Sequence, residues 1–189
     1  VITAGTFLAK SIRAAEACKV IENTQRDVNI AFMNEVSMVL HKMNIDTRDV
    51  LAAMKTKWNA LGFAPGLVGG HCIGVDPYYL IHKAYAHGHS MDIARTARLV
   101  SDTIPDFIVE QLILTMCQKS ILVKNSRILI MGASFKENCT DTRNARTFDI
   151  AHALKNYGAV VDFYDPVVNV EEVEHVTGFT TLRDIPQKN

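Results

Sequence analysis

Glycine and proline are spread very unevenly along this chain of 189 residues, and their positions limit the folds open to it. Residues 7–43 contain neither, whereas residues 58–74 hold five of the ten glycines. Both residue types interrupt helices, so the first stretch can form one unbroken helix and the second must be a loop. Apolar residues also recur at helical spacing through the first stretch. The sequence therefore predicts a helix roughly 50 Å long and, further on, a glycine-rich loop.

A helix of this length is longer than a small domain requires. Its apolar stripe, which includes Val28, Phe32 and Val39, predicts burial against more than one neighbour. An interface shared between two subunits would provide the second neighbour. We therefore expect a homodimer formed through the helix at 7–43.

Shorter elements follow the long helix. Helical patterns are found at 47–57, 77–86, 92–100 and 105–120. Asp46 and Thr47 are suitable caps for the first of these, and Pro105 suits the first turn of the last. After Lys124 the pattern changes to a buried strand at 127–132, a helix at 145–157 and a second strand at 159–164. A strand, a helix and a strand within so short a stretch indicate a βαβ unit of a parallel sheet.

The predicted fold class is α/β overall. Residues 1–122 are expected to form an all-helical central dimerisation domain, and residues 123–189 the start of a Rossmann-like parallel α/β domain. The chain begins at Val1 and shows no signal-peptide pattern, and we expect it to be a piece of a longer protein.

Composition and charge exclude several classes of function. The chain is 48% hydrophobic, which is enough for a sizeable core, and its 20 basic and 20 acidic residues leave no net charge. A neutral chain has no field of one sign to attract nucleic acid or an anionic membrane, and its apolar runs are too short to span a bilayer. We therefore predict a globular protein with no nucleic-acid partner and no membrane partner.

The four cysteines are widely spaced and include no CxxC pair, which argues against a disulfide framework and for a reducing, cytoplasmic location. Cys18 and Cys117 lie in helical patterns and are expected to be buried. The spacing of the histidines and the cysteine between residues 71 and 89 matches no familiar zinc pattern, so no metal site is predicted.

The glycine-rich loop contains the most reactive candidate of the chain. Glycines flank Cys72 on both sides, and Asp76 follows at the predicted start of a helix. A thiol in a glycine loop beside a helix N-terminus is well placed for a lowered pKa, and hence for acting as a nucleophile. The alternative is a tight structural turn with an incidental cysteine. These residues alone do not decide between the two.

Two further polar features accompany the loop. Lys19 and Asn23 lie one turn apart on the long helix and could together hold an oxyanion or a water, although a solvated helix face is the simpler interpretation. The loop at 132–144 joins the strand and the helix of the βαβ unit, where open α/β sheets bind ligands. In it, Lys136 and Arg143 could pair with phosphate. The loop has no GxGxxG pattern, so a generic surface loop is the alternative.

Together these features resemble the UDP-glucose/GDP-mannose dehydrogenase family, and within it the branch of UDP-N-acetyl-D-mannosamine and UDP-N-acetylglucosamine 6-dehydrogenases. The resemblance rests on the segments 15–35, 56–80, 134–144 and 161–168, which are distributed over nearly the whole chain. The run PGLVGGHCIGVDPYYL at 65–80 is its most specific part.

The resemblance implies an NAD-dependent enzyme that oxidises the C6 alcohol of a UDP-sugar to the acid in two hydride transfers. It also implies an N-terminal NAD-binding Rossmann domain, a central helical domain that forms the dimer, and a C-terminal UDP-binding domain. The first of these is expected to be absent from this chain, so the fragment alone is expected to be inactive. The family usually serves polysaccharide biosynthesis.

The resemblance further implies roles for individual residues. Cys72 matches the nucleophile that forms a thiohemiacetal and then a thioester, and Asp76 matches the acid/base that helps water to hydrolyse it. Lys19 and Asn23 match residues that stabilise the oxyanion and position water. Arg143 matches an arginine near the cofactor phosphates. The residues that match the substrate-binding set are Trp58, Asn59, Phe63, Gly66, Gly69, Gly70, Phe135 and Lys136.

Three alternatives stay open. The chain could be a UDP-sugar-binding and dimerisation module without turnover, a UDP-glucose 6-dehydrogenase, or a hydroxyacid-type dehydrogenase with a similar helical domain. A module without turnover would have little reason to retain Cys72, Asp76 and Lys19 together. A hydroxyacid dehydrogenase would require a lysine and no cysteine.

Overall fold

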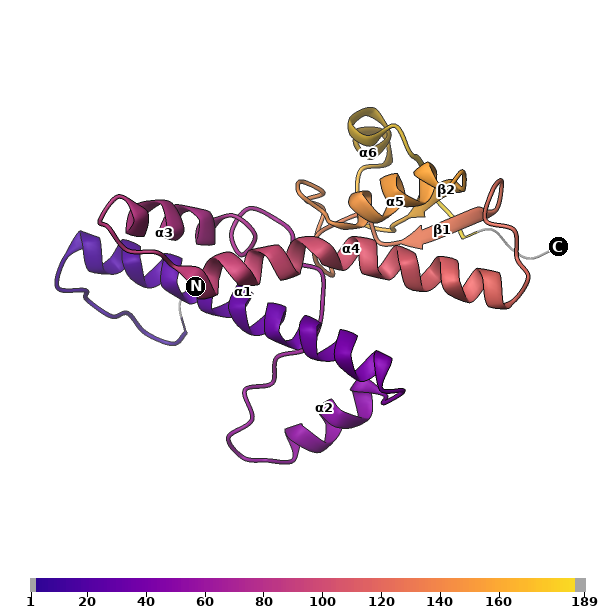
Figure 1. The fold of residues 1–189 in the computed structure, drawn as a ribbon. Coiled ribbons are helices and arrows are strands. Elements are labelled where there is room, and N and C mark those ends of the chain that lie inside the picture. The colour runs from indigo at the N-terminus through magenta and orange to yellow at the C-terminus, as the bar shows by residue number, and fades with distance from the viewer. Residues whose placement is uncertain (1–2, 186–189) are drawn as a thin grey trace.

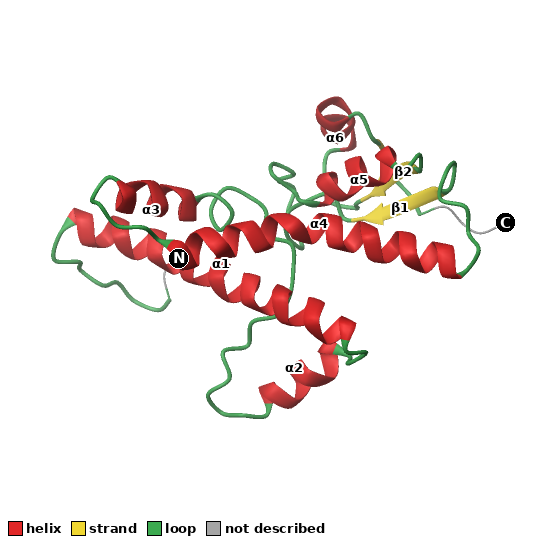
Figure 2. Cartoon of the chain, in the orientation of Figure 1, coloured by secondary structure: helices red, strands yellow, loops and turns green. Residues whose placement is uncertain are grey.

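The computed structural model describes residues 3–185 as a helical unit and a small α/β unit that share one long helix (Figure 1, Figure 2). The helices are α1 (Ile12–Lys42), α2 (Thr47–Lys55), α3 (Asp76–Tyr85), α4 (Asp92–Gln118), α5 (Thr147–Asn156) and α6 (Val170–Thr177). The strands are β1 (Arg127–Met131), β2 (Val160–Tyr164) and β3 (Thr180–Leu182). This arrangement confirms the predicted fold class, a largely helical chain that ends in a parallel α/β fold.

Helix α1 is shorter than predicted at its N-terminal end. Ser11 caps it by accepting a hydrogen bond from the backbone N–H of Ala14 at 3.2 Å, and the helix begins at Ile12. Phe7 and Leu8 lie outside the helix and are almost fully exposed. The predicted start at Phe7 was therefore wrong. The absence of glycine and proline permits a helix, whereas a capping side chain defines where it begins.

Helix α4 is continuous from Asp92 to Gln118, which corrects the prediction of separate helices at 92–100 and 105–120. Pro105 lies inside it, where the missing N–H and the ring cost about 3 kcal/mol. The helix packs on both sides, against α1 and against α5, and Pro105 is itself buried. Tertiary packing therefore outweighs the local preference of proline.

The α/β unit contains a parallel sheet in the strand order β1–β2–β3. Helix α5 connects β1 to β2, as the predicted βαβ unit requires, and α6 connects β2 to β3. The core surrounds Phe163 of β2 and includes Leu154 of α5, Val173 of α6 and Val109 of α4. Since the first half of α4 packs on α1, this helix belongs to both units and joins them (Figure 1).

The side of α1 that faces the rest of the chain is partly polar and partly apolar. Asn23, Asp27 and Asn34 are buried on it, whereas Phe32 and Val39 are 60% and 52% exposed. Ala31 of the stripe and the neighbouring Met33 are also buried, and α1 contacts α2, α3 and α4. The predicted packing against more than one neighbour is therefore present, while Phe32 and Val39 of the stripe remain exposed.

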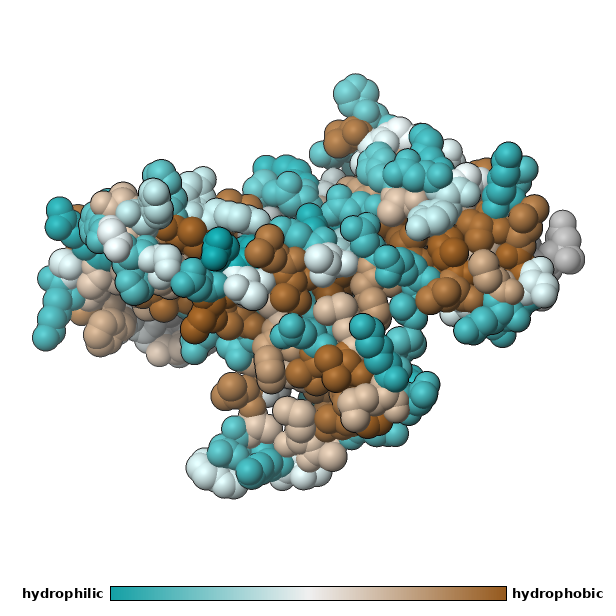
Figure 3. All heavy atoms as spheres, in the orientation of Figure 1, coloured by the Kyte–Doolittle hydropathy of each residue, from teal (hydrophilic) through white to brown (hydrophobic). Residues whose placement is uncertain are grey.

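Hydrophobic side chains gather on the surface in patches. Figure 3 shows them over α2 with the adjoining end of α1, and again over the second half of α4.

Cys18 on α1 and Cys117 on α4 are exposed, so the expectation that both are buried was wrong. Helical periodicity does not reveal which face of a helix packs against the chain. None of the helices in residues 3–185 combines the length and the apolar character that crossing a bilayer requires.

Candidate functional site

The glycine-rich loop is fixed to α1 at Gly66. Asn34, which is buried on α1, donates from Nδ2 to the Gly66 carbonyl at 3.0 Å. The Gly66 N–H in turn donates to Asn34 Oδ1 at 2.8 Å. One side chain therefore satisfies both backbone groups of a loop residue, as a buried polar contact requires. This anchor sets the path of the loop toward the turn that contains Cys72.

Two glycines then bring the loop against the segment that joins β1 to α5. The Gly70 N–H donates to the Asn144 carbonyl at 3.2 Å. A Cβ atom on Gly69 would lie 2.4 Å from that carbonyl oxygen, and one on Gly70 would lie 2.8 Å from the ring of Phe135. Gly70 also has a φ of 78°, which favours glycine. Both positions therefore require glycine for the two loops to touch.

The four residues predicted to be catalytic meet where α1 lies against the start of α3. Lys19 Nζ donates to Asn23 Oδ1 at 3.1 Å, and Asn23 Nδ2 donates to Asp76 Oδ2 at 2.5 Å. The Cys72 carbonyl accepts from the Asp76 N–H at 2.8 Å, so both residues belong to one turn. Cys72 is exposed, while Asn23 is buried. An amine, an amide and a carboxylate are thereby connected, and the turn that supplies the carboxylate also carries an exposed thiol.

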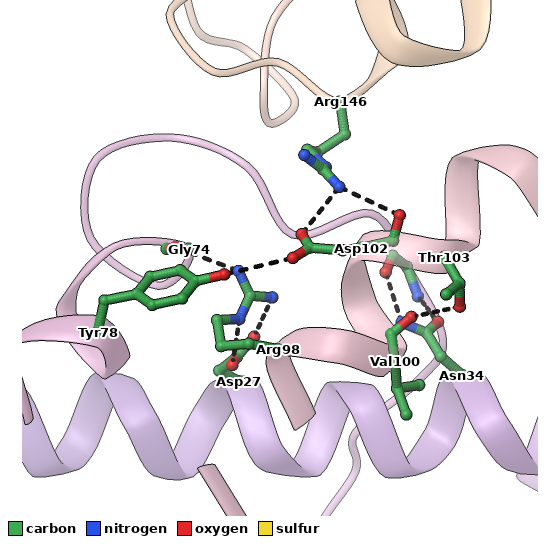
Figure 4. Close-up of polar contacts among 10 residues, drawn as sticks. Asp27, Asn34, Gly74, Tyr78, Arg98, Val100, Asp102, Thr103 and Arg146 are labelled. Carbon is green, nitrogen blue, oxygen red and sulfur yellow. Dashed lines mark hydrogen bonds and ion pairs between the residues drawn. The ribbon is translucent and has the colours of Figure 1, made fainter. Parts of the chain in front are cut away.

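A buried ion pair lies behind this turn, and no motif in the sequence pointed to it (Figure 4). Arg98 of α4 donates from Nε and Nη2 to the two carboxylate oxygens of Asp27, both at 2.7 Å. Its Nη1 donates to the Gly74 carbonyl at 3.1 Å. Burial raises the pKa of Asp27, and the guanidinium of Arg98 opposes that rise. The sequence offered one indication of a buried role for Asp27, which is that Asp27 follows Asn23 by one helical turn on α1.

A second polar link ties the turn to the α/β unit (Figure 4). Tyr78 of α3 donates its hydroxyl proton to Asp102 Oδ2 on α4 at 3.3 Å. Arg146, just before α5, donates to Asp102 Oδ1 at 2.9 Å. Burial and the negative charge of Asp102 raise the pKa of Tyr78. One carboxylate thus connects three segments, and sequence reasoning missed all three residues because they are distant in the chain.

A cleft of about 400 Å³ lies at the C-terminal ends of β1 and β2. Gly69, Phe135 and Lys136, three of the predicted substrate-binding residues, line it. Asp165, which follows β2, fixes its edge by accepting a hydrogen bond from the Ala133 N–H at 2.9 Å. Open parallel sheets bind ligands at this edge. The cleft is therefore a candidate ligand site of the α/β unit.

The other predicted substrate-binding residues lie elsewhere on the loop. Trp58 is 94% exposed, and Asn59 and Phe63 line a separate hollow of about 310 Å³ against α1. Gly66 and Gly70 take part in the backbone contacts described above. The structure therefore does not bring Trp58, Asn59 and Phe63 into the cleft.

Arg143, the predicted cofactor contact, is mostly exposed and is held by Asp141. Its Nε and Nη2 donate to the carboxylate at 2.9 and 2.8 Å, and this guanidinium holds the pKa of Asp141 well below its usual range. His71, which precedes Cys72, lies 3.9 Å from the same carboxylate, so Arg143 is close to the cysteine turn. In the part of the chain that the structure describes, no three His, Cys, Asp or Glu side chains are grouped to hold a metal ion.

Comparison with known proteins gives matches along most of the chain. Residues 13–103 match the central domain of the UDP-glucose/GDP-mannose dehydrogenase family, and residues 129–188 match its UDP binding domain. The chain is 49% identical over 185 residues to the UDP-N-acetyl-D-glucosamine 6-dehydrogenase of Salmonella typhi, and 51% identical over 182 residues to that of Pseudomonas aeruginosa. These alignments cover 98% and 96% of the chain. They cover only 44% and 43% of the relatives, so the chain spans less than half of their length.

Solved structures are similar in fold. A UDP-D-ManNAc dehydrogenase from Pyrococcus horikoshii superposes with a TM-score of 0.79 at 29% identity, over 89% of this chain and 40% of that one. An NDP-N-acetyl-D-galactosaminuronic acid dehydrogenase from Methanosarcina mazei superposes with a TM-score of 0.81 at 26% identity, over 93% of this chain and 38% of that one.

Proposed function

Because the chain belongs to the UDP-glucose/GDP-mannose dehydrogenase family, we propose that it forms part of an NAD-dependent UDP-N-acetylhexosamine 6-dehydrogenase. The observation that carries the proposal is the connected set of Lys19, Asn23 and Asp76 beside the exposed thiol of Cys72. The names of the relatives favour an N-acetylated hexosamine over glucose. In this proposal the enzyme is cytoplasmic and its product enters polysaccharide biosynthesis.

The first oxidation converts the C6 alcohol into an aldehyde, with loss of a hydride and transfer of the hydroxyl proton to water. Lys19 donates to Asn23 and Asn23 donates to Asp76, and each side chain keeps at least one further N–H group. These N–H groups would stabilise negative charge on the sugar oxygen. The Cys72 thiolate then attacks C6, and a carbon–sulfur bond forms as the carbonyl π electrons move to oxygen. Protonation of that oxygen gives a thiohemiacetal.

The second oxidation removes a hydride from C6 and the hydroxyl proton, which leaves a thioester on Cys72. Asp76 then accepts a proton from a water whose oxygen attacks C6. The carbon–sulfur bond breaks, the thiolate leaves with the bonding electrons, and the sugar acid is formed. The contact of 2.5 Å from Asn23 holds the Asp76 carboxylate for this step.

NAD would supply the hydride acceptor for both oxidations. Among the described residues, Arg143 fits a dinucleotide, since an exposed guanidinium can bind a pyrophosphate through two parallel hydrogen bonds. The segment between β1 and α5 begins with Gly132 but has no further glycine of a dinucleotide fingerprint. We therefore propose that most of the cofactor site is formed by residues outside this chain, and that residues 1–189 alone are inactive.

The UDP-sugar is proposed to lie across the cleft of the α/β unit with its sugar toward Cys72. The amine of Lys136 would meet the diphosphate, and Gly69 and Phe135 would line the cleft around it. Trp58 is exposed outside the cleft. Its proposed role in binding, together with that of its neighbours in the loop, requires this part of the loop to close over the sugar.

We also propose a homodimer formed through α1. Phe32 and Ile93, 60% and 75% exposed, border an apolar groove between α1 and α4, and adjoining exposed apolar side chains mark contact surfaces. Sedimentation velocity is expected to give a dimer for this chain. Phe32→Glu should shift it to monomer because a charge would be buried, whereas Lys83→Glu, on the exposed surface of α3, should leave it dimeric. A wild-type chain that sediments as a monomer would contradict the proposal.

The proposed activity is tested by NADH formation in the complete enzyme. UDP-N-acetylglucosamine, UDP-N-acetylmannosamine, UDP-N-acetylgalactosamine and UDP-glucose would each be supplied with NAD, and residues 1–189 would be assayed in parallel. We expect two NADH per sugar for one N-acetylated substrate and none from residues 1–189. Two NADH from UDP-glucose alone would indicate the UDP-glucose 6-dehydrogenase alternative. Retained UDP-sugar binding without NADH would indicate a binding module.

A further inference from the structure

Of the ion pairs formed by the described residues, the one between Asp27 and Arg98 is the most deeply buried. Their side chains are 0% and 5% exposed. Removing two charges from water is costly, and packed apolar side chains of similar volume in such a place are often as stable or more stable. Stability alone therefore does not account for the pair. Its additional feature is the hydrogen bond from Arg98 to the Gly74 carbonyl.

Gly74 lies midway between Cys72 and Asp76, in the turn that carries both. The turn is closed from within by the N–H groups of Val75 and Asp76, which donate to the Cys72 carbonyl at 3.0 and 2.8 Å. The bond from Arg98 holds the same turn from outside, at a carbonyl that faces α4 (Figure 4). These contacts together fix both the shape of the turn and its placement on the helices.

The three contacts of Arg98 depend on the planar geometry of a guanidinium. Nε and Nη2 engage the two oxygens of Asp27, and Nη1 is left to reach Gly74. A lysine could keep the charge but has no rigid fork that meets three acceptors in fixed directions. Asp27 also follows Asn23 by one turn of α1. The same helix thus holds Asp76 directly through Asn23, and the turn indirectly through Arg98.

We propose that Asp27 and Arg98 are positioning residues, which hold the turn at 72–76 so that the Cys72 thiol and the Asp76 carboxylate face the same C6 atom of the sugar. The proposal rests on the proposed dehydrogenase function. Neither residue touches the substrate. A displacement of the turn by about 1 Å would lower the rate about a hundredfold without removing any catalytic group.

The position of the turn can be tested without any activity, by hydrogen exchange in the chain of 189 residues. Arg98→Lys is expected to speed exchange of the Val75 and Asp76 amides about tenfold, because the hydrogen bond from a charged donor is lost. Arg95→Lys is the matched control on α4, since Arg95 pairs only with Asp92 at the surface in the described chain. Unchanged exchange in Arg98→Lys would overturn the proposal, whatever the enzyme's activity.

The second test separates positioning from folding in the complete enzyme. Arg98→Lys is expected to lower kcat about a hundredfold while KM stays the same, and Arg95→Lys to change neither. Asp27→Leu/Arg98→Met replaces the pair by apolar side chains, so it should melt at or above the wild-type temperature and still show the loss in kcat. A folded double variant with wild-type kcat would overturn the proposal.

The two tests also distinguish this proposal from the proposed function. A wild-type enzyme that forms no NADH would refute the dehydrogenase, and the positioning of the turn would then be judged by the exchange of Val75 and Asp76 alone. A rise in KM with unchanged kcat in Arg98→Lys would show that the pair serves substrate binding. It would overturn the proposal that the pair positions Cys72 and Asp76.

Discussion

Replacement of Cys72 by alanine in the complete enzyme is expected to abolish the formation of two NADH per sugar, with a loss in rate of at least about a thousandfold. Without the sulfur there is no covalent thioester, and the carboxylic acid cannot form by the proposed route. Lys19, Asn23 and Asp76 would remain in place, because their side chains bond to one another and Asp76 contacts only the backbone carbonyl of Cys72. Binding of UDP, measured by calorimetry, is therefore expected to be unchanged.

Cys117→Ala is the matched control for this experiment. Cys117 is also an exposed thiol, but it lies near the end of α4, outside the candidate site, so NADH formation should be unaffected. If Cys72→Ala retained full activity, the thioester route would be wrong. A hydroxyacid-type mechanism, which needs a lysine and no cysteine, would then be the better account.

Gly69→Ala is expected to destabilise the chain by about 1–3 kcal/mol. Its Cβ would lie 2.4 Å from the backbone oxygen of Asn144, and backbone atoms cannot move aside as a flexible side chain can. The contact between the cysteine loop and the α/β unit would have to open. Thermal unfolding of the chain should show this as a Tm lower by several degrees.

Gly66→Ala is the matched control, since a Cβ there meets no heavy atom within 4 Å. Its Tm should stay close to that of the wild type. Equal Tm values for Gly69→Ala and the wild type would show that the two loops do not touch in solution. The proposed path of the UDP-sugar from the cleft of Lys136 toward Cys72 would then be incorrect.

Much of the local structure could be predicted from short runs of residues. Asp46 accepts from the Arg48 N–H and begins α2 at the expected place. Gly158 follows α5 with a φ of 82°, as expected of a residue that ends a helix. The predicted strands at 127–132 and 159–164 agree with β1 and β2 to within one residue at each end. Caps and turns depend on neighbouring residues, so a single sequence contains the necessary information.

The candidate site could be predicted only where its residues carry a recognisable motif. Cys72 and Asp76 lie in a distinctive run, and the spacing of Lys19 and Asn23 placed both on one face of a helix. The structure connects Lys19, Asn23 and Asp76, while the catalytic roles of all four residues stay a proposal. Arg98 was missed because nothing in its neighbourhood distinguishes it from the exposed Arg95, one turn earlier on α4.

The sequence by itself therefore determined most of the helices, the strands β1 and β2, the glycine loop and the chemical character of its residues. Only the tertiary structure decided that Asn23, Asp27 and Asn34 of α1 turn inward, that α4 continues through Pro105, and that Arg98 reaches Asp27 from 71 positions away. The physical reason is the range of the interactions. Hydrogen bonds within a turn are set by adjacent residues, whereas burial and ion pairing depend on which distant segments come to lie side by side.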